Sequence, residues 1–155
     1  MGIFSKLKNA ISGGGATVTV EIGNAAVGTE FPVTVRAQVG GSDIQISRVY
    51  VQLVGHEEVR LRGVKRTERR GAELVDVDSD LERAETTFEA NVTLSGAQTL
   101  AANSSHEWTG KLAIPAGLPP TFQGRNARHA WKVLAGLDCW GNDPDSGWQI
   151  IAVRA

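Results

Sequence analysis

The chain has 155 residues, with 16 basic and 17 acidic side chains, a net charge of -1 at pH 7 and one cysteine. This length suits one domain that folds without a disulfide or a metal. The balanced charge excludes a global attraction to nucleic acid, and one cysteine excludes an internal disulfide. No apolar run approaches the roughly 18 residues of a membrane-spanning helix. We therefore expect a cytoplasmic protein.

Residues 1–12 predict a short amphipathic helix, and residues 13–15 predict a glycine linker. Lys6 and Lys8 lie opposite the apolar side chains, and they also interrupt any hydrophobic region of a signal peptide. One interpretation docks this helix on its own domain or on a second subunit. The other lays it in a membrane interface, where binding would be weak. The candidate contact residues are Ile3, Phe4 and Leu7, with Ile11 continuing the apolar face.

After the glycines, apolar and polar residues alternate with the period of two that is typical of half-buried strands. In the longest such segment, residues 44–55, the apolar side chains move from even to odd positions near Ser47 and Arg48, which a β-bulge would explain. At least seven strands are expected, and no further helix. An all-β, immunoglobulin-like antiparallel sandwich over residues 16–155 is the predicted fold. The strand segments are 16–22, 30–39, 44–55, 86–94, 106–115, 130–139 and 147–153.

Residues 60–86 divide into a basic half and an acidic half with Gly71 and Ala72 between them. A turn at these two residues would set Arg70 opposite Glu73 in a charged hairpin arm. The alternatives are a disordered loop or a basic patch that binds an acidic partner. The candidate partner-binding residues are Arg66, Arg69 and Arg70.

No constellation of catalytic, cofactor-binding or metal-binding residues is convincing. His129 and Cys139 lie on one predicted strand, about 33 Å apart at roughly 3.3 Å per residue, so they cannot form a dyad while that strand is unbroken. A dyad through His56 or His106 stays open. The acidic residues near Asp143 fit a calcium loop less well than a turn, because they lack the EF-hand spacing.

The segment from Ile114 to Asp138 carries a resemblance to a known family. It is similar to the "IP-x-x-LPP-S/T-F-x-G" segment and following strand of arrestin-like domains, over about residues 85 to 154. The helical start followed by glycines is similar to bacterial sporulation-control proteins of the arrestin-like type. Within the strand, odd positions are expected to line the core and Asp138 to point away. The matching residues are Pro115, Leu118, Pro119, Pro120, Phe122, Gly124, Trp131, Leu137 and Asp138.

Members of that family are two tandem sandwiches used as adaptors and scaffolds, whereas this chain has the length of one. The resemblance implies a non-enzymatic protein-interaction module that binds through an edge strand or a concave sheet. It names no partner, and homo-oligomers through edge strands or the N-terminal helix are possible. The alternative is a self-assembling or membrane-peripheral structural protein anchored by residues 1–12. A third hypothesis is an enzyme or a carbohydrate-binding sandwich with exposed Trp140 or Trp148 as a stacking platform.

Overall fold

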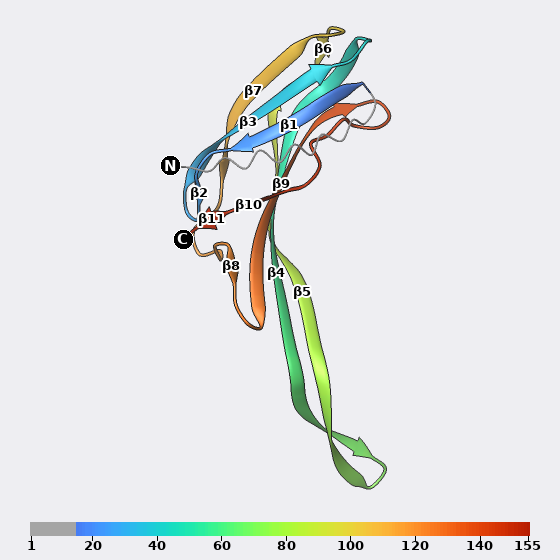
Figure 1. The fold of residues 1–155 in the computed structure, drawn as a ribbon, viewed down its shortest axis with the longest axis vertical. Coiled ribbons are helices and arrows are strands. Elements are labelled where there is room, and N and C mark those ends of the chain that lie inside the picture. Colours follow the sequence, from blue (N-terminus) through green and yellow to red (C-terminus); the bar gives the residue numbers. More distant parts are fainter. Residues whose placement is uncertain (1–14) are drawn as a thin grey trace.

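A computed structural model describes residues 15–155, which form a two-layered body with one long hairpin projecting from it (Figure 1). The expected helix over residues 1–12 and most of the glycine linker lie outside the described residues. The strands are β1 (Ala16–Ile22), β2 (Ala25–Ala26), β3 (Glu30–Val39), β4 (Ile44–Arg70), β5 (Glu73–Ser95), β6 (Gln98–Leu100), β7 (Ser105–Ala113), β8 (Phe122–Gln123), β9 (Ala127–Cys139), β10 (Gln149–Ile151) and β11 (Val153–Arg154).

Two antiparallel sheets make up the body. One has the order β1-β3-β7, and the other has the order β10-β9-β4-β5, with β6 beside β4 and β8 beside β9. The short strands β2 and β11 pair in parallel. The predicted all-β sandwich is therefore confirmed, and its core lies between the two sheets because each long strand turns its apolar side chains inward.

The predicted core positions of β9 are confirmed. Trp131, Val133 and Leu137 are fully buried, and the partly buried Cys139 packs against the core. His129, which belongs to the same odd series but was not among the expected core residues, is also buried at 1% exposure.

The predicted bulge in the third long segment is also confirmed. The pairing of β4 with β9 shifts register between Ile46 and Arg48. Ile46 faces the core before the shift, and Val49 and Val51 face it afterwards. The extra residue therefore returns the apolar side chains to the inner face when the sequence changes parity.

Residues 60–86 belong to a hairpin, and the alternative of a disordered loop is wrong. Gly71 and Ala72 form the turn, and Arg70 faces Glu73 as expected. The strands are longer than predicted: β4 has 27 residues, whereas strands in globular proteins usually have about 3–10. β9 pairs with β4 only as far as Val59, so residues 60–82 continue as a two-stranded ribbon, which we call the arm (Figure 1).

Candidate interaction site

The β5 strand of the arm has one face with an apolar column and one face with an acidic column. On the face with the apolar column, Arg66 and Glu68 of β4 lie opposite Val77 and Val75. Side chains alternate between the faces of a strand, so Val75, Val77 and Leu81 share one face of β5. Leu61 lies opposite Leu81 across the ribbon, and Val64 lies opposite Ser79 on the same face. The other face of β5 carries acidic side chains in a column: Asp76, Asp78, Asp80 and Glu82.

Apolar side chains on the arm remain open to solvent. Leu81 is 53% exposed and Leu74, next to the turn, is 73% exposed. A two-stranded hairpin is marginally stable in water because it has no second layer on which to bury such side chains. The arm therefore exposes an apolar side chain on each of its two faces.

The three arginines that the sequence nominated all lie on the β4 strand of the arm and are exposed. Arg66 and Arg70 both contact Glu68 on their own strand, with N–O distances of 2.5 and 3.8 Å. Arg69 makes no ion pair among the described residues. Between the two strands of the arm, the described ion pair is Arg60 with Glu82 at 2.7 Å. Exposed pairs of this kind contribute about 0–1 kcal/mol each, so they do not hold the arm together.

Both edges of the arm lack a neighbouring strand in the described chain. The order β10-β9-β4-β5 makes β5 an outer strand, and β4 loses its contact with β9 after Val59. Unpaired N–H and C=O groups therefore run along both sides of the ribbon, where a further strand can add by main-chain hydrogen bonding.

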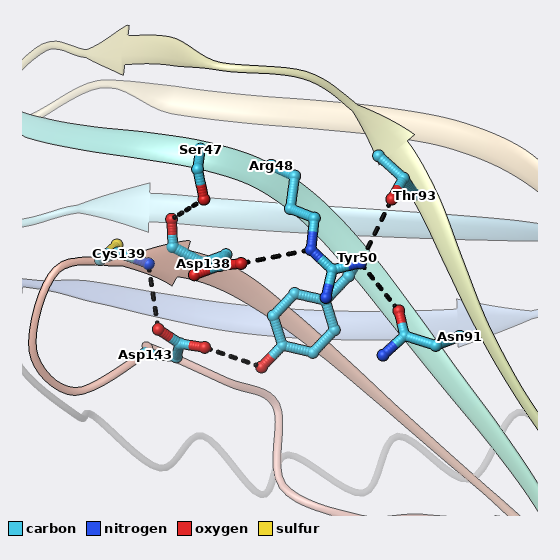
Figure 2. Close-up of polar contacts among 8 residues, drawn as sticks. All are labelled: Ser47, Arg48, Tyr50, Asn91, Thr93, Asp138, Cys139 and Asp143. Carbon is cyan, nitrogen blue, oxygen red and sulfur yellow. Dashed lines mark hydrogen bonds and ion pairs between the residues drawn. The ribbon is translucent and has the colours of Figure 1, made fainter.

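A polar network on the outer face of the large sheet ties β4, β5 and β9 together (Figure 2). Arg48 donates to Asp138 at 3.2 Å and to Asn91 at 2.9 Å, and also to Thr93 at 3.2 Å. Its guanidinium lies 5.0 Å from the ring centre of Tyr50. Asp138, which the family resemblance singled out, thus links β9 to Arg48 of β4, the strand that continues into the arm.

Tyr50 connects the same sheet to the loop after β9. Its hydroxyl donates to Asp143 at 3.2 Å, and the backbone N–H of Cys139 donates to the other oxygen of that carboxylate at 3.0 Å (Figure 2). Burial, and next the charge of Asp143, raise the pKa of Tyr50 to about 12. The Asp143 carboxylate therefore holds the loop in place. Within residues 15–155, no group of three or more His, Cys, Asp or Glu side chains is placed to hold a metal ion.

The cysteine and histidines are not arranged for nucleophilic catalysis in the described part of the chain. Burial raises the pKa of Cys139, with Asp143 and Asp138 adding to the effect, so the thiol is not activated. His129 is on the same strand and lies near the opposite end of β9. The side chain of His56 lies 3.7 Å from Glu58, and that of His106 bonds Ser104 at 2.7 Å, so neither makes a hydrogen bond to the thiol.

His129 is a core residue. Its Nε2 bonds the hydroxyl of Thr87 at 2.7 Å, and its ring lies against Phe122 and Trp131, with centroids 6.4 and 5.3 Å away. Burial lowers its pKa, which favours the neutral imidazole.

Several residues that carried the family resemblance are held to the sandwich by packing and hydrogen bonds. The indole N–H of Trp131 donates to the carbonyl of Pro119 at 3.0 Å, and the N–H of Gly124 donates to Ala127 at 2.7 Å. Leu118 packs on the core and Leu137 is part of it. Pro115 is exposed and Pro120 is half-buried. Packing therefore explains Leu118, Trp131 and Leu137, and a main-chain hydrogen bond involves Gly124.

The two tryptophans nominated as a stacking platform are both exposed. Trp140 is fully exposed and Trp148 is 43% exposed. The ammonium group of Lys132 lies 4.5 Å from the ring centre of Trp148, so one face of that ring already has a cation on it. Residues 15–155 include no helix with the length and apolar character needed to cross a bilayer.

Comparisons with known proteins place the fold. No family model matches the sequence, and no curated protein matches it. Among solved structures, the chain is similar to Spo0M, sporulation control protein, from Bacillus subtilis, with a TM-score of 0.62 and 19% sequence identity. The match covers 92% of this chain and 50% of the Spo0M chain, so the chain spans about half the length of that protein. At this identity the likeness concerns the fold alone, and the chain has the arrestin-like β-sandwich fold that its LPP segment indicated.

Proposed function

We propose that this chain is a non-catalytic protein-interaction module that works in the cytoplasm and presents the arm to a protein partner. One observation carries the proposal: the strands β4 and β5 leave the sandwich as a ribbon with two open edges and exposed apolar side chains. Open strand edges and amphipathic faces are features through which β-sandwich proteins bind other chains.

The polar network supports this interpretation. Asn91 and Thr93 of β5 and Arg48 of β4 hold both strands to the sheet below the arm. Leu53 of β4 is fully buried in the core. A ribbon that continues from core strands keeps its position relative to the sandwich, so it is suited to placing a bound partner.

The test is affinity capture from the native cell with a shortened arm as the matched comparison. Replacing residues 61–81 with Asn-Gly closes the hairpin directly above the Arg60–Glu82 pair with a two-residue turn that suits antiparallel strands. We expect mass spectrometry to find partner proteins with the wild-type chain that are absent with the shortened chain. Equal recovery by both chains would show that the arm is not the binding surface. Recovery of nothing above background by the wild type would refute the module itself.

A second candidate is a membrane-peripheral structural role anchored by residues 1–12, and it rests on their amphipathic sequence pattern alone. Co-sedimentation with anionic liposomes, compared between the full chain and a chain that lacks residues 1–12, tests it. Pelleting of the full chain only supports the anchor, whereas equal behaviour of the two chains contradicts it.

A further inference from the structure

The two strands of the arm carry opposite charge. Between residues 60 and 70, β4 has six basic side chains and one acidic one, a net charge of +5. Between residues 73 and 82, β5 has five acidic side chains and no basic one, a net charge of -5. The arm as a whole is neutral, but one of its open edges is basic and the other is acidic.

Much of this charge is not used inside the described chain. Lys65 faces Asp78 across the ribbon, yet their side chains form no ion pair there. Arg69 and Glu73 make no side-chain hydrogen bond or ion pair among the described residues either. These four side chains are therefore available to a neighbouring strand.

Charge on an edge strand often serves to prevent sheet-to-sheet aggregation. For that purpose one sign on both edges is sufficient, because every pairing between copies is then repulsive. Opposite signs on the two edges leave one pairing attractive: the β4 edge of one copy against the β5 edge of another. Opposite charges facing each other across strands contribute roughly 0.2–1 kcal/mol per pair, and like charges directly opposite are destabilising.

The signs also select the symmetry of the contact. A two-fold contact between edges pairs β4 with β4 or β5 with β5, which places like charges together. A head-to-tail contact pairs β4 with β5 and places opposite charges together. Contacts of the head-to-tail kind continue from copy to copy into a ring or a filament.

Resting on the proposed function, we propose that the arm binds the arm of a second copy of this chain head to tail, with the basic β4 edge of one copy along the acidic β5 edge of the next. The added strand turns a two-stranded ribbon into a wider sheet. The side chains of the added strand lie beside exposed apolar side chains such as Leu81 on the same face of the wider sheet.

The test is sedimentation velocity of the purified full chain over a range of protein and salt concentrations. Wild-type chains are expected to show a sedimentation coefficient that rises with concentration in about 0.05 M salt and falls to the monomer value near 1 M salt, where the Debye length is only about 3 Å. Lys65→Glu/Arg69→Glu lowers the β4 charge from +5 to +1, and Glu73→Lys/Asp78→Lys changes the β5 charge from -5 to -1. Each double variant alone is expected to be monomeric.

Mixing the two variants gives the sharpest outcome. The first variant keeps an intact acidic strand and the second an intact basic strand, so an equimolar mixture is expected to associate although neither variant does so alone. The control, Lys111→Glu/Arg154→Glu, makes the same change in net charge on the sandwich and is expected to assemble as the wild type does.

Three results overturn the inference. If the wild-type chain remains monomeric at several hundred micromolar in low salt, the arm does not bind a second copy. Capture of other proteins through the arm would then still support the interaction module. Self-assembly of either double variant alone indicates a two-fold contact. Assembly that salt does not weaken indicates that the opposite charges are not its cause.

Discussion

Gly136 allows Tyr50 to lie flat across β9, and replacing it with alanine tests this close contact. A Cβ atom at Gly136 would lie 2.5 Å from Cζ of Tyr50 and 2.9 Å from Cε1, distances at which either the ring or the strand must move. Tyr50 is directly opposite Gly136 in the pairing of β4 with β9 and is only 8% exposed. The ring is confined by Arg48 on one side and by its bond to Asp143 on the other.

The expected cost follows from those contacts. Overpacking costs about 1–3 kcal/mol, and loss of the hydrogen bond to the Asp143 carboxylate adds about 1–2 kcal/mol. We therefore expect Gly136→Ala to lower the free energy of unfolding by about 2–5 kcal/mol. In a chain of this size that corresponds to a fall in Tm of roughly 4–20 °C.

Urea unfolding followed by tryptophan fluorescence measures the change, with Gly96→Ala as the control because a Cβ there meets nothing within 4 Å. A double-mutant cycle with Tyr50→Ala isolates the contact. Without the ring, Gly136→Ala is expected to be neutral or stabilising, since alanine is favoured over glycine inside a strand by about 0.5–1 kcal/mol. A coupling energy below about 0.5 kcal/mol between the two positions would refute the reasoning.

Three further outcomes are expected at Tyr50, His129 and Cys139. Tyr50 is the single tyrosine, so absorbance at 295 nm should report its pKa of about 12. Asp143→Asn should lower that pKa, while burial keeps it above 10. An unchanged pKa in this variant would contradict the role of Asp143. Burial lowers the pKa of His129 in the folded state, so as the pH falls the unfolded state binds a proton at a higher pH than the folded state does. The free energy of unfolding should therefore fall as the pH drops below about 6.5. His129→Phe should flatten that dependence, which is measured by urea unfolding at each pH. Cys139, whose pKa is raised, should react slowly with Ellman's reagent at pH 8 and at the rate of a free thiol in urea; rapid reaction of the folded chain would show that the thiol is activated.

The sandwich was predictable because its strands repeat a local pattern. Val18, Val20 and Ile22 alternate with polar residues, and so do Val33, Val35 and Ala37 of β3, so each strand shows which face is buried before any partner strand is known. The short strands β2, β8 and β11 have two residues each, which is too few for a period to be detected.

The continuity of β4 from the core into the arm was hidden by an irregularity in that strand. Val75, Val77 and Leu81 alternate with acidic residues, a signal of a strand that charge content obscured. On the opposite strand, the register shifts between Leu61 and Val64, and Gly63 takes a φ of 62°. Such a bulge breaks the period of two, so the sequence pattern does not indicate that the two halves of β4 form one strand.

The polar network could not be predicted from the sequence. Arg48, Asn91, Asp138 and Asp143 come from segments that are distant in the chain, and only the register of three strands brings them together. The pairs Arg48–Asp138 and Tyr50–Gly136 follow from the pairing of β4 with β9, which local propensity does not determine.

The arm and the core are parts of the same two strands, and this limits how the arm can act. Leu53 and Val51 of β4 are fully buried, and Asn126 accepts a hydrogen bond from the N–H of Arg60 at 2.7 Å at the base of the arm. With no loop between the core and the ribbon, sliding either strand by one residue would expose the core side chains of that strand. A partner bound along the arm is therefore held at a fixed register relative to the sandwich, whereas a flexible tether would leave it free to move. The same continuity means that a strand added to the arm of one copy orders the next copy with respect to the first.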